Sequence, residues 1–546
     1  MRPSGYDADE FHALLTSLPE DSMPPARPST RSRRATPPAL AWQLADSSAS
    51  GCAAALDALA RVGQARREPV RRQTWILLDT FDERLADAGW RLEAWQRPRG
   101  GDIECCLRAA DSVSGEGWRS SALPRSAHDL PDARLAARLA SLCETRALLP
   151  RCTVPMTRHT VHWHDALHKR IGSVDVLRAG ARGGLPARLF VVVRPVRGEA
   201  EACERLLGAC AGVLVSATAV DPARVLRAER GGPVYRAKPV TELGREAPAA
   251  EALAALFAAY GEVLWANERG IVEDIDAEFL HDFRVALRSL RSWTGDLRKV
   301  MTKAARARVK QELATLNDAT GRLRDLDVLA AALDGYLAEV GGIAPDAAAR
   351  LADLVLTARK EAQHALARHL DSAAYRRFKR RWPRLCQQLA AGRHRGRDGD
   401  APLLEVVTAA LRRRRAAVID FDWSHAEDEP AVLHELRKEC KKLRYLLEGF
   451  QRLFDQGRVR RAIAELKLVQ RAMGDTWDLH VHHALLEELT AALPAAEARA
   501  VLPVVIGLGT RLSALEHAHV ELVSRAFARF RSTEEQRIYS RLSDRP

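Results

Sequence analysis

The chain has 546 residues, of which 47% are hydrophobic and 28% charged, and its 84 Lys and Arg residues outnumber its 71 Asp and Glu residues to give a net charge of +13. This length allows two or three domains with buried cores, and the hydrophobic fraction is that of a folded protein. The positive balance favours an anionic partner. The sequence has no run of 18 apolar residues and no signal-peptide pattern, so we expect a cytoplasmic protein that does not bind a membrane.

The N-terminal part changes character at about residue 37. Residues 1–36 are rich in Pro, Ser and Arg and have few apolar side chains to bury, so we predict that they are disordered. From 37 to 245, short β-like runs such as QTWILLDT, IECCLRAA, TVHWHDAL, GSVDVLRA and RLFVVVRPV alternate with turns, and helical stretches occur at 50–63 and 199–210. This pattern predicts an antiparallel α+β domain.

From about residue 250 to 535 the sequence is helical in character. Long stretches of Ala, Leu, Arg and Glu follow a period of 3.6 residues, and chain-breaking segments occur at 341–346, 391–402 and 421–430. We therefore predict an all-α domain of several antiparallel helices, followed by a short tail at 536–546. The predicted fold class is α+β and then all-α.

Two segments of the helical region, 153 positions apart, repeat one pattern. The first contains His281, Arg284, Arg288 and Arg291, and the second contains His434, Arg437, Lys441 and Arg444. The offset persists downstream, where Gly321 corresponds to Gly474 and Asp325 to Asp478. A match that stays in register over this length indicates a duplication, and we predict two repeats at about 255–400 and 405–535.

The spacing of each cationic set predicts one face of a helix. Residues at i, i+3, i+7 and i+10 fall within roughly 80° of arc. An apolar face lies beside each set: Leu280, Phe283, Leu287 and Leu290 in the first copy, and Leu433, Leu436 and Leu443 in the second. A solvated basic face would explain one copy alone. Two copies in register, each beginning with a histidine, favour a binding surface.

The strings HDFRVALRSLRSW with GRLRDLDVL, and HELRKECKKLRYLLEGF with QRAMGDTWDLHV, resemble the CHAD family of histidine-containing α-helical domains. The resemblance covers about 255–535. It implies two four-helix bundles related by a pseudo-twofold axis, with a shared basic surface that binds inorganic polyphosphate. The contacts that it implies are His281, Arg284, Arg288 and Arg291 in the first repeat, and His434, Arg437, Lys441, Lys442 and Arg444 in the second.

Other basic residues extend this expected polyphosphate track. They are Lys438 in the second copy, Lys310 and Lys467 ahead of the Gly-to-Asp motifs, and Arg376, Lys379, Arg380 and Arg413 from a basic concentration between the copies. Consecutive arginines point around a helix, so part of that concentration must be solvated surface. Polyphosphate offers little but charge to recognise, so its affinity must come from many charge-assisted contacts and must fall steeply with salt.

Residues 37–245 resemble a divergent CYTH domain, the triphosphate tunnel fold, through LLDTFDERLADAGWRLE, RLFVVVRPVRGEAEACERL and PVYRAKPV. The resemblance implies that an active member has an E-x-E-x-K strand and a second acidic strand. Here ALAWQL (39–44) has no acid, and Arg194 stands where a carboxylate is expected. Divalent ions that bridge triphosphate oxygens need carboxylates, so we expect no hydrolysis and assign no catalytic residue. A candidate anion lining remains, with ion-paired surface as the alternative: Arg84, Arg91, Arg108, Arg194, Arg236 and Lys238.

We expect no metal and no other cofactor. The nine cysteines contain no C-x-x-C pair and are predicted to be reduced thiols. Two histidines, His281 and His434, do not complete a metal site, and the cluster His159, His162, His164 and His168 lacks other ligands at suitable spacing. We interpret Asp325, Asp327 and Asp478 as helix caps or as partners of arginine.

The function that this sequence predicts is polyphosphate binding, for targeting or scaffolding at soluble polyphosphate or polyphosphate granules, with no catalysis or only weak catalysis. Two other function classes stay open. One is an inorganic triphosphatase or polyphosphate-processing enzyme that uses the CYTH-like domain. The other is a nucleic-acid binder, whose contacts would be nonspecific because the basic helices lack the interleaved aromatic residues that stack on bases.

Overall fold

The computed structural model describes residues 40–98, 100–110, 115–181, 185–210, 218–219, 221–340, 344–422, 430–532 and 536–539. The predicted disordered segment 1–36 and residues 540–546 of the predicted tail lie outside this set. The chain divides into two compact units. The first comprises Met1–Gln73, Arg108–Glu116 and Pro155–Val225, and the second comprises Thr74–Leu107, Gly117–Val154 and Leu226–Pro546.

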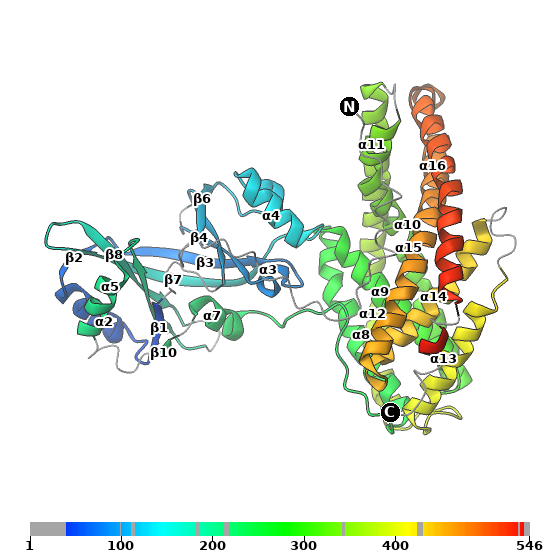
Figure 1. Ribbon diagram of the computed structural model, residues 1–546, viewed down its shortest axis with the longest axis horizontal. Coiled ribbons are helices and arrows are strands. Elements are labelled where there is room, and N and C mark those ends of the chain that lie inside the picture. The colour runs from blue at the N-terminus through cyan, green and yellow to red at the C-terminus, as the bar shows by residue number, and fades with distance from the viewer. Residues whose placement is uncertain are drawn as a thin grey trace. The chain divides into compact units, whose positions relative to one another are not determined.

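The first unit contains an antiparallel sheet with helices on one face (Figure 1). Its strands are β1 (Leu40–Leu44), β2 (Gln64–Arg67), the C-terminal part of β7 (Leu149–His164), β8 (Arg170–Ala179), β9 (Arg188–Pro195) and β10 (Thr218–Ala219). The strand order is β10-β1-β9-β8-β7, and β2 pairs with β7. Alternate residues of β7, β8 and β9 form a core with helices α2 (Ala49–Arg61) and α5 (Ala200–Ala209).

The second unit begins with a smaller β-rich segment. Its strands β3 (Arg71–Asp79), β4 (Trp90–Gln96), β5 (Ile103–Ala109) and β6 (Glu116–Ser120) follow one another in the sheet. The short helix α3 (Arg84–Asp87), the 3-10 turn η1 (Ala127–Asp129) and helix α4 (Ala133–Cys143) accompany them, and α7 (Pro222–Arg230) comes later in the chain. Leu92, Leu107 and Leu139 belong to the buried core that these elements share.

The rest of the second unit is helical (Figure 1). Its elements are α8 (Ala249–Val272), α9 (Ala277–Asp296), α10 (Lys303–Glu339), α11 (Pro345–Leu370), α12 (Ala373–Ala390), α13 (Leu403–Ile419), α14 (Pro430–Phe450), η2 (Gln451–Leu453), α15 (Gln456–Ala491) and α16 (Ala495–Phe530). The predicted breaker at 391–402 falls between α12 and α13, whereas residues 341–343 and 423–429 of the other two predicted breakers lie outside the described residues. The predicted fold class, α+β followed by all-α, is confirmed.

The predicted apolar faces of the two repeated segments are buried. Leu280, Phe283, Leu287 and Leu290 on α9, and Leu436 and Leu443 on α14, are at most 2% exposed, while the side chain of Leu433 lies outside the described residues. The two helices pack directly on each other. The indole N–H of Trp293 donates to the carbonyl oxygen of Tyr445 at 3.0 Å, and a Cβ at Gly449 would lie 2.4 Å from the Trp293 ring. Only glycine fits at that contact.

One described helix, α8, is long and apolar enough to meet the length and composition of a membrane span. Of its most apolar 18-residue window, 61% is buried inside the protein. Leu253, Phe257 and Leu264 of α8 belong to the same core as the apolar face of α9. Its apolar character therefore serves the interior of the helical bundle.

Candidate anion site on the helical unit

Helix α9 has a basic face, and the capping residue at its start helps to fix the direction of that face. The Asp276 carboxylate caps the helix and accepts hydrogen bonds from the backbone N–H groups of Glu278 at 3.0 Å and Phe279 at 3.3 Å. With Phe283 and its apolar neighbours fixed in the core, the remaining arc carries His281, Arg284 and Arg288, which are partly exposed, and Arg291, which is exposed. The predicted cationic set thus lies along one accessible side of α9.

Arg284 is held by neutral groups of α10. Its guanidinium donates to the carbonyl oxygen of Asn317 at 3.2 Å and to the hydroxyl of Thr320 at 2.7 Å. Burial and the neighbouring Arg288 lower the pKa of Arg284 to about 10, against the opposing effect of Asp325. A cation bonded to uncharged oxygens and crowded by other cations is oriented but poorly neutralised. This arrangement favours an incoming anion.

His281 lies in the same positive environment. Burial, and then Arg324 and Arg288, lower its pKa to about 4, and Glu278 opposes this shift. Its Nδ1 atom is buried and has no hydrogen-bond partner. We did not select Arg324 from the sequence, although it stands within the GRLRDLDVL motif. The available signal was its spacing of seven residues from Asn317 and fourteen from Lys310, which places all three on one face of α10.

The basic face of α14 differs in how its cations are paired. Burial, and then Lys438, lower the pKa of His434 to about 4, and Glu435 opposes this shift. Several cations of α14 form ion pairs with glutamates of their own helix: Lys438 with Glu435 at 2.6 Å, Lys442 with Glu439 at 2.5 Å and Arg444 with Glu448 at 3.5 Å. On α9 the described contacts of Arg284 and Arg288 are hydrogen bonds to uncharged oxygens.

The predicted contact Lys467 lies on α15, and its side chain is exposed.

The predicted contacts on α12 are used elsewhere in the described structure. Arg376 pairs with Asp371 at 2.9 Å and Lys379 pairs with Glu268 of α8 at 2.6 Å, whereas Arg380 is exposed. Neither of these two ion pairs involves the basic face of α9. Arg413 on α13 does reach α9, because it donates to the carbonyl oxygen of Asp296 at 2.6 Å.

The first unit contains a polar centre that is neutralised internally. Asp175 on β8 is fully buried and pairs with Arg158 at 3.0 Å and with Arg194, and it accepts a hydrogen bond from Thr160 at 2.7 Å. Burial alone would raise the pKa of Asp175, but Arg194 and Arg158 bring it below the ordinary value. No sequence pattern distinguishes this one acid within its Val-rich strand. Arg194 therefore compensates a carboxylate instead of standing free for an anion.

The other residues of the candidate anion lining are also engaged. Their partners are carboxylates: Arg84 pairs with Asp82 at 2.9 Å, Arg91 with Glu93 at 3.0 Å, Arg236 with Asp87 at 2.8 Å and Lys238 with Glu448 at 3.1 Å. Arg108 is not without an interaction partner either. The alternative interpretation of these residues, as ion-paired surface, fits the structure better than an anion lining.

Among the described residues, no three His, Cys, Asp or Glu side chains come together as metal ligands. His162 is paired with Glu68 at 2.6 Å. Asp327 pairs with Arg359 at 2.8 Å, as we interpreted it from the sequence, while the side chain of Asp478 lies outside the described residues. The nine cysteines are free thiols, and eight of them are buried.

Comparison with known proteins identifies the helical part. The model of the CHAD domain matches residues 255–487. Residues 255–487 form a CHAD domain. The uncharacterized protein Rv2226 of Mycobacterium tuberculosis (strain ATCC 25618 / H37Rv) is 30% identical over 227 residues, which are 40% of this chain and 42% of that protein. The chain thus matches less than half the length of this curated relative.

Three solved structures are similar to parts of this chain. The CHAD domain from the plant Ricinus communis is 24% identical, with a TM-score of 0.46, over 53% of this chain and 95% of that one. PptA from Streptomyces chartreusis is 16% identical, with a TM-score of 0.40, over 52% and 99%. The putative adenylyl cyclase HpAC1 from Hippeastrum, described as having a dominant triphosphatase activity, is 12% identical, with a TM-score of 0.28, over 36% and 98%.

Proposed function

We propose that this protein binds inorganic polyphosphate through the basic faces of α9, α10 and α14 in its CHAD domain. Polyphosphate binding is the property known for this family, and residues 255–487 match its model. The observation that carries the proposal is the group of His281, Arg284, Arg288 and Arg324, in which burial, Arg288 and Arg324 all lower the pKa of both His281 and Arg284. A chain of phosphates would neutralise them without displacing a carboxylate.

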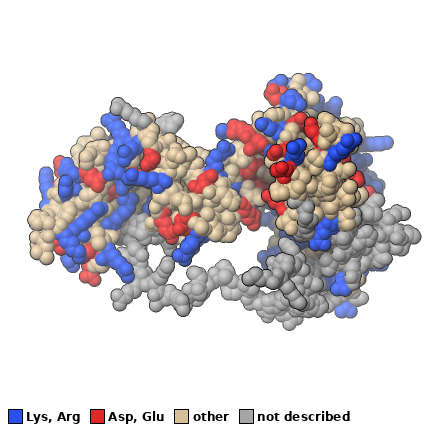
Figure 2. Space-filling model, turned by 90° about the horizontal axis from the view of Figure 1, so that it is seen from above, with Lys and Arg blue, Asp and Glu red and all other residues tan. Residues whose placement is uncertain are grey.

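The position of positive charge supports a track more than a general basic surface. On the face drawn in Figure 2, the Lys and Arg side chains of the helical part are interspersed with Asp, Glu and uncharged residues. The chain also pairs many of its cations with carboxylates, as in the first unit and on α12. The cations of α9 whose contacts are uncharged therefore differ from the bulk of the charge, and they line up along one helix.

Salt-dependent binding tests the proposal. Long-chain polyphosphate is titrated into the full-length protein at pH 8 and several salt concentrations, and the slope of log affinity against log salt is measured. The double variant Arg288→Ala/Arg324→Ala should bind at least about tenfold more weakly, and its slope should fall by roughly 1.4 if each contact contributes about 0.7. The matched control, Arg134→Ala/Arg205→Ala, removes two exposed arginines from α4 and α5. Equal losses in both double variants would show that only net charge matters.

Competition separates polyphosphate binding from nucleic-acid binding. Labelled single-stranded RNA or duplex DNA is bound first, and unlabelled polyphosphate is added at equal phosphate concentration. Polyphosphate should displace either nucleic acid much more effectively than the reverse. Displacement by nucleic acid at equal or lower phosphate concentration would favour the nucleic-acid interpretation.

A further inference from the structure

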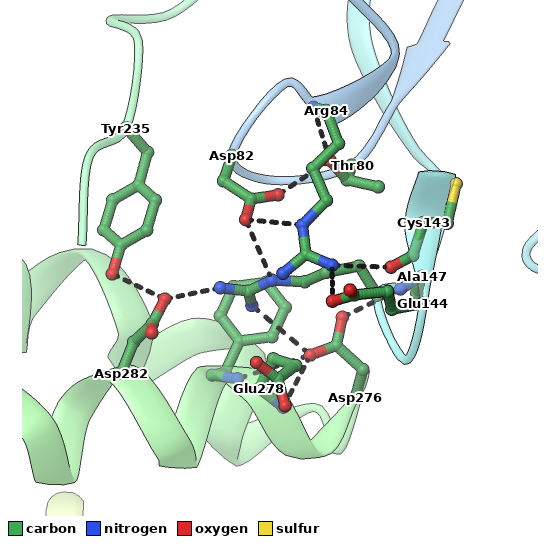
Figure 3. Close-up of polar contacts among 12 residues, drawn as sticks. Thr80, Asp82, Arg84, Cys143, Glu144, Ala147, Tyr235, Asp276, Glu278 and Asp282 are labelled. Carbon is green, nitrogen blue, oxygen red and sulfur yellow. Dashed lines mark hydrogen bonds and ion pairs between the residues drawn. The ribbon is translucent and has the colours of Figure 1, made fainter. Parts of the chain in front are cut away.

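A buried ionic cluster at the start of α9 connects the CHAD domain to chain segments that precede it. Its centre is Arg146, which follows α4 and whose side chain is 1% exposed. The guanidinium pairs with Asp282 of α9, with the capping residue Asp276 at 3.4 Å, and with Asp82 at 3.6 Å (Figure 3). All of these residues belong to the second compact unit. One arginine thus bridges the β-rich segment and the first turns of α9.

Further contacts hold the same junction. The backbone N–H of Ala147 donates to Asp276 at 2.9 Å, and the hydroxyl of Tyr235 donates to Asp282 at 3.0 Å (Figure 3). The Arg146 guanidinium also lies 5.2 Å from the centre of the Phe279 ring. Asp276 and Asp282 are therefore each held from outside the helix that carries them. The orientation of the first turns of α9 depends on these partners.

The second repeat has no equivalent of this arrangement among the described contacts. The duplication aligns Asp282 with Glu435, because both follow the histidine directly. Asp282 has a side chain 10% exposed and pairs with Arg146, whereas Glu435 has one 57% exposed and pairs with Lys438 of its own helix. The same position thus carries a buried link to another segment in one repeat and a surface ion pair in the other.

We propose that Arg146 is a positioning residue for the anion site of the first repeat, acting through Asp276 and Asp282 to fix the part of α9 that carries His281 and Arg284. The inference rests on the proposed function for its ligand. It goes beyond that function in two ways. A residue outside the matched CHAD region helps to position the site, and only the first repeat has this support. Breaking a buried pair on one side leaves an uncompensated charge, so the helix start must rearrange when Arg146 is lost.

Groups from every neighbouring element affect His281, and they make it a reporter of this junction. Glu278 and Arg288 of α9, Arg324 of α10 and Arg146 all act on its pKa, and burial is the largest influence. Loss of Arg146 removes one positive charge and loosens the burial, and both changes raise the pKa of His281 from about 4 toward its ordinary value. This shift can be measured without any ligand.

The test uses the full-length protein with Arg146→Met, Arg146→Lys and the control Arg151→Met. Arg151 belongs to the same unit, pairs with Glu83 at 3.6 Å and lies over Phe81, which itself packs on Phe279; its loss removes an equal charge but no described ion pair with a residue of α9. The titration of His281 is followed by NMR and assigned with His281→Gln. Arg146→Met should raise the pKa of His281 and weaken polyphosphate binding at pH 8 by about fivefold, whereas Arg151→Met should change neither.

A second pair of variants guards against simple unfolding. Asp282→Asn keeps the size of the side chain, and Glu435→Gln is its counterpart in the second repeat. Asp282→Asn should shift His281 and weaken binding, Glu435→Gln should leave His281 unchanged, and Arg146→Lys should restore part of the Arg146→Met loss. If Arg146→Met and Arg151→Met lose equal affinity, or if the His281 titration is unchanged, the inference is overturned. If the wild type does not bind polyphosphate, the proposed function fails, while the His281 titration still decides the role of Arg146.

Discussion

Helices α9 and α14 derive from the same repeated sequence pattern, yet their surroundings differ. Each carries a histidine and cations at the same spacing, and each buries its apolar side in the same core. On α9 the described contacts of Arg284 and Arg288 are with uncharged oxygens, and the start of the helix is bound to Arg146. On α14 several cations pair with glutamates of the same helix. The two copies of a duplicated motif can therefore keep the same cationic residues and still differ in how much of that positive charge is left for an anion.

The difference matters because a glutamate paired with a cation offsets part of the positive charge that a polyanion would meet, although exposed ion pairs within one helix are weak. Such pairs contribute only about 0.3–0.5 kcal/mol, so a polyanion can replace the glutamate at little cost. The free charge of α9 needs no such exchange. We expect the first repeat to contribute more affinity per cation, and the second to provide length for the track.

The contact between the two helices should show the largest effect. Trp293 of α9 is fully buried against α14, and Leu446 of α14 is the residue aligned with it by the duplication. Trp293→Ala should lower the free energy of unfolding by about 3–5 kcal/mol, and Leu446→Ala by about 2–5 kcal/mol. Chemical denaturation measures both. A loss under about 1 kcal/mol for Trp293→Ala would mean that the two helices do not depend on this contact.

Removing the two arginines at equivalent positions of the repeats should give the next largest effect. Arg284→Ala/Arg437→Ala should weaken polyphosphate binding about a hundredfold, since a charged hydrogen bond contributes about 1.5–3 kcal/mol and distant sites add. Calorimetric titration of both single variants and of the double variant measures this. Thr320→Val, which removes an acceptor of Arg284 but no charge, is the control for orientation and should cost much less. A double variant that binds like either single variant would confine the site to one repeat.

The sequence predicted the helical character of this region well, because local periodicity determines it. Leu280, Phe283, Leu287 and Leu290 recur at helical spacing, and all are buried as expected. The β-rich region was recognised from its strand runs, and the resulting antiparallel sheet agrees with the CYTH-like resemblance. In both regions the deciding signal lies within about twenty residues of sequence. Patterns of that length need no knowledge of partners from elsewhere in the chain.

The ionic partners of the basic residues could not be predicted in this way. Arg146 and Asp282 are 136 positions apart, and neither stands in a motif that points to the other. The pairing of Arg194 with Asp175 depends on the register of two strands, which alternation alone does not determine. Arg324 was overlooked for the same reason, because its nearness to His281 comes from the packing of α10 on α9. The sequence shows which residues are charged, but the fold determines which carboxylate neutralises each arginine.

A smaller effect should appear with pH. The pKa of His281 and of His434 is lowered to about 4, so both are neutral above pH 6.5 in the free protein. The unfolded chain binds more protons between about pH 6.5 and 4, and the free energy of unfolding should fall as pH decreases through that range. A bound phosphate opposes the shift, so binding should take up protons and strengthen by roughly tenfold per histidine by pH 5.5, if each imidazole regains its reference pKa.

Calorimetry in two buffers of different ionisation enthalpy measures this proton uptake directly. His281→Gln and His434→Gln should each remove part of it, and the window lies below the pH range of 6 to 8 that an unshifted imidazole would give. Uptake that survives in both variants would assign the protons to other groups. Uptake lost with only one of them would show which helix places its histidine next to phosphate.

The smallest expected effect concerns the lysines of α14 that already have carboxylate partners. Lys438→Ala and Lys442→Ala each remove a cation whose charge is partly offset, by Glu435 for Lys438 and for Lys442 by Glu439, which also pairs with Arg414, so each should weaken binding by less than about twofold. Arg291→Ala, at an exposed position of α9, should cost more and should reduce the salt slope by roughly 0.7. The comparison between the helices holds only if Arg291→Ala weakens binding more than either lysine substitution does. Equal losses at the three positions would mean that the glutamates do not offset charge toward the ligand.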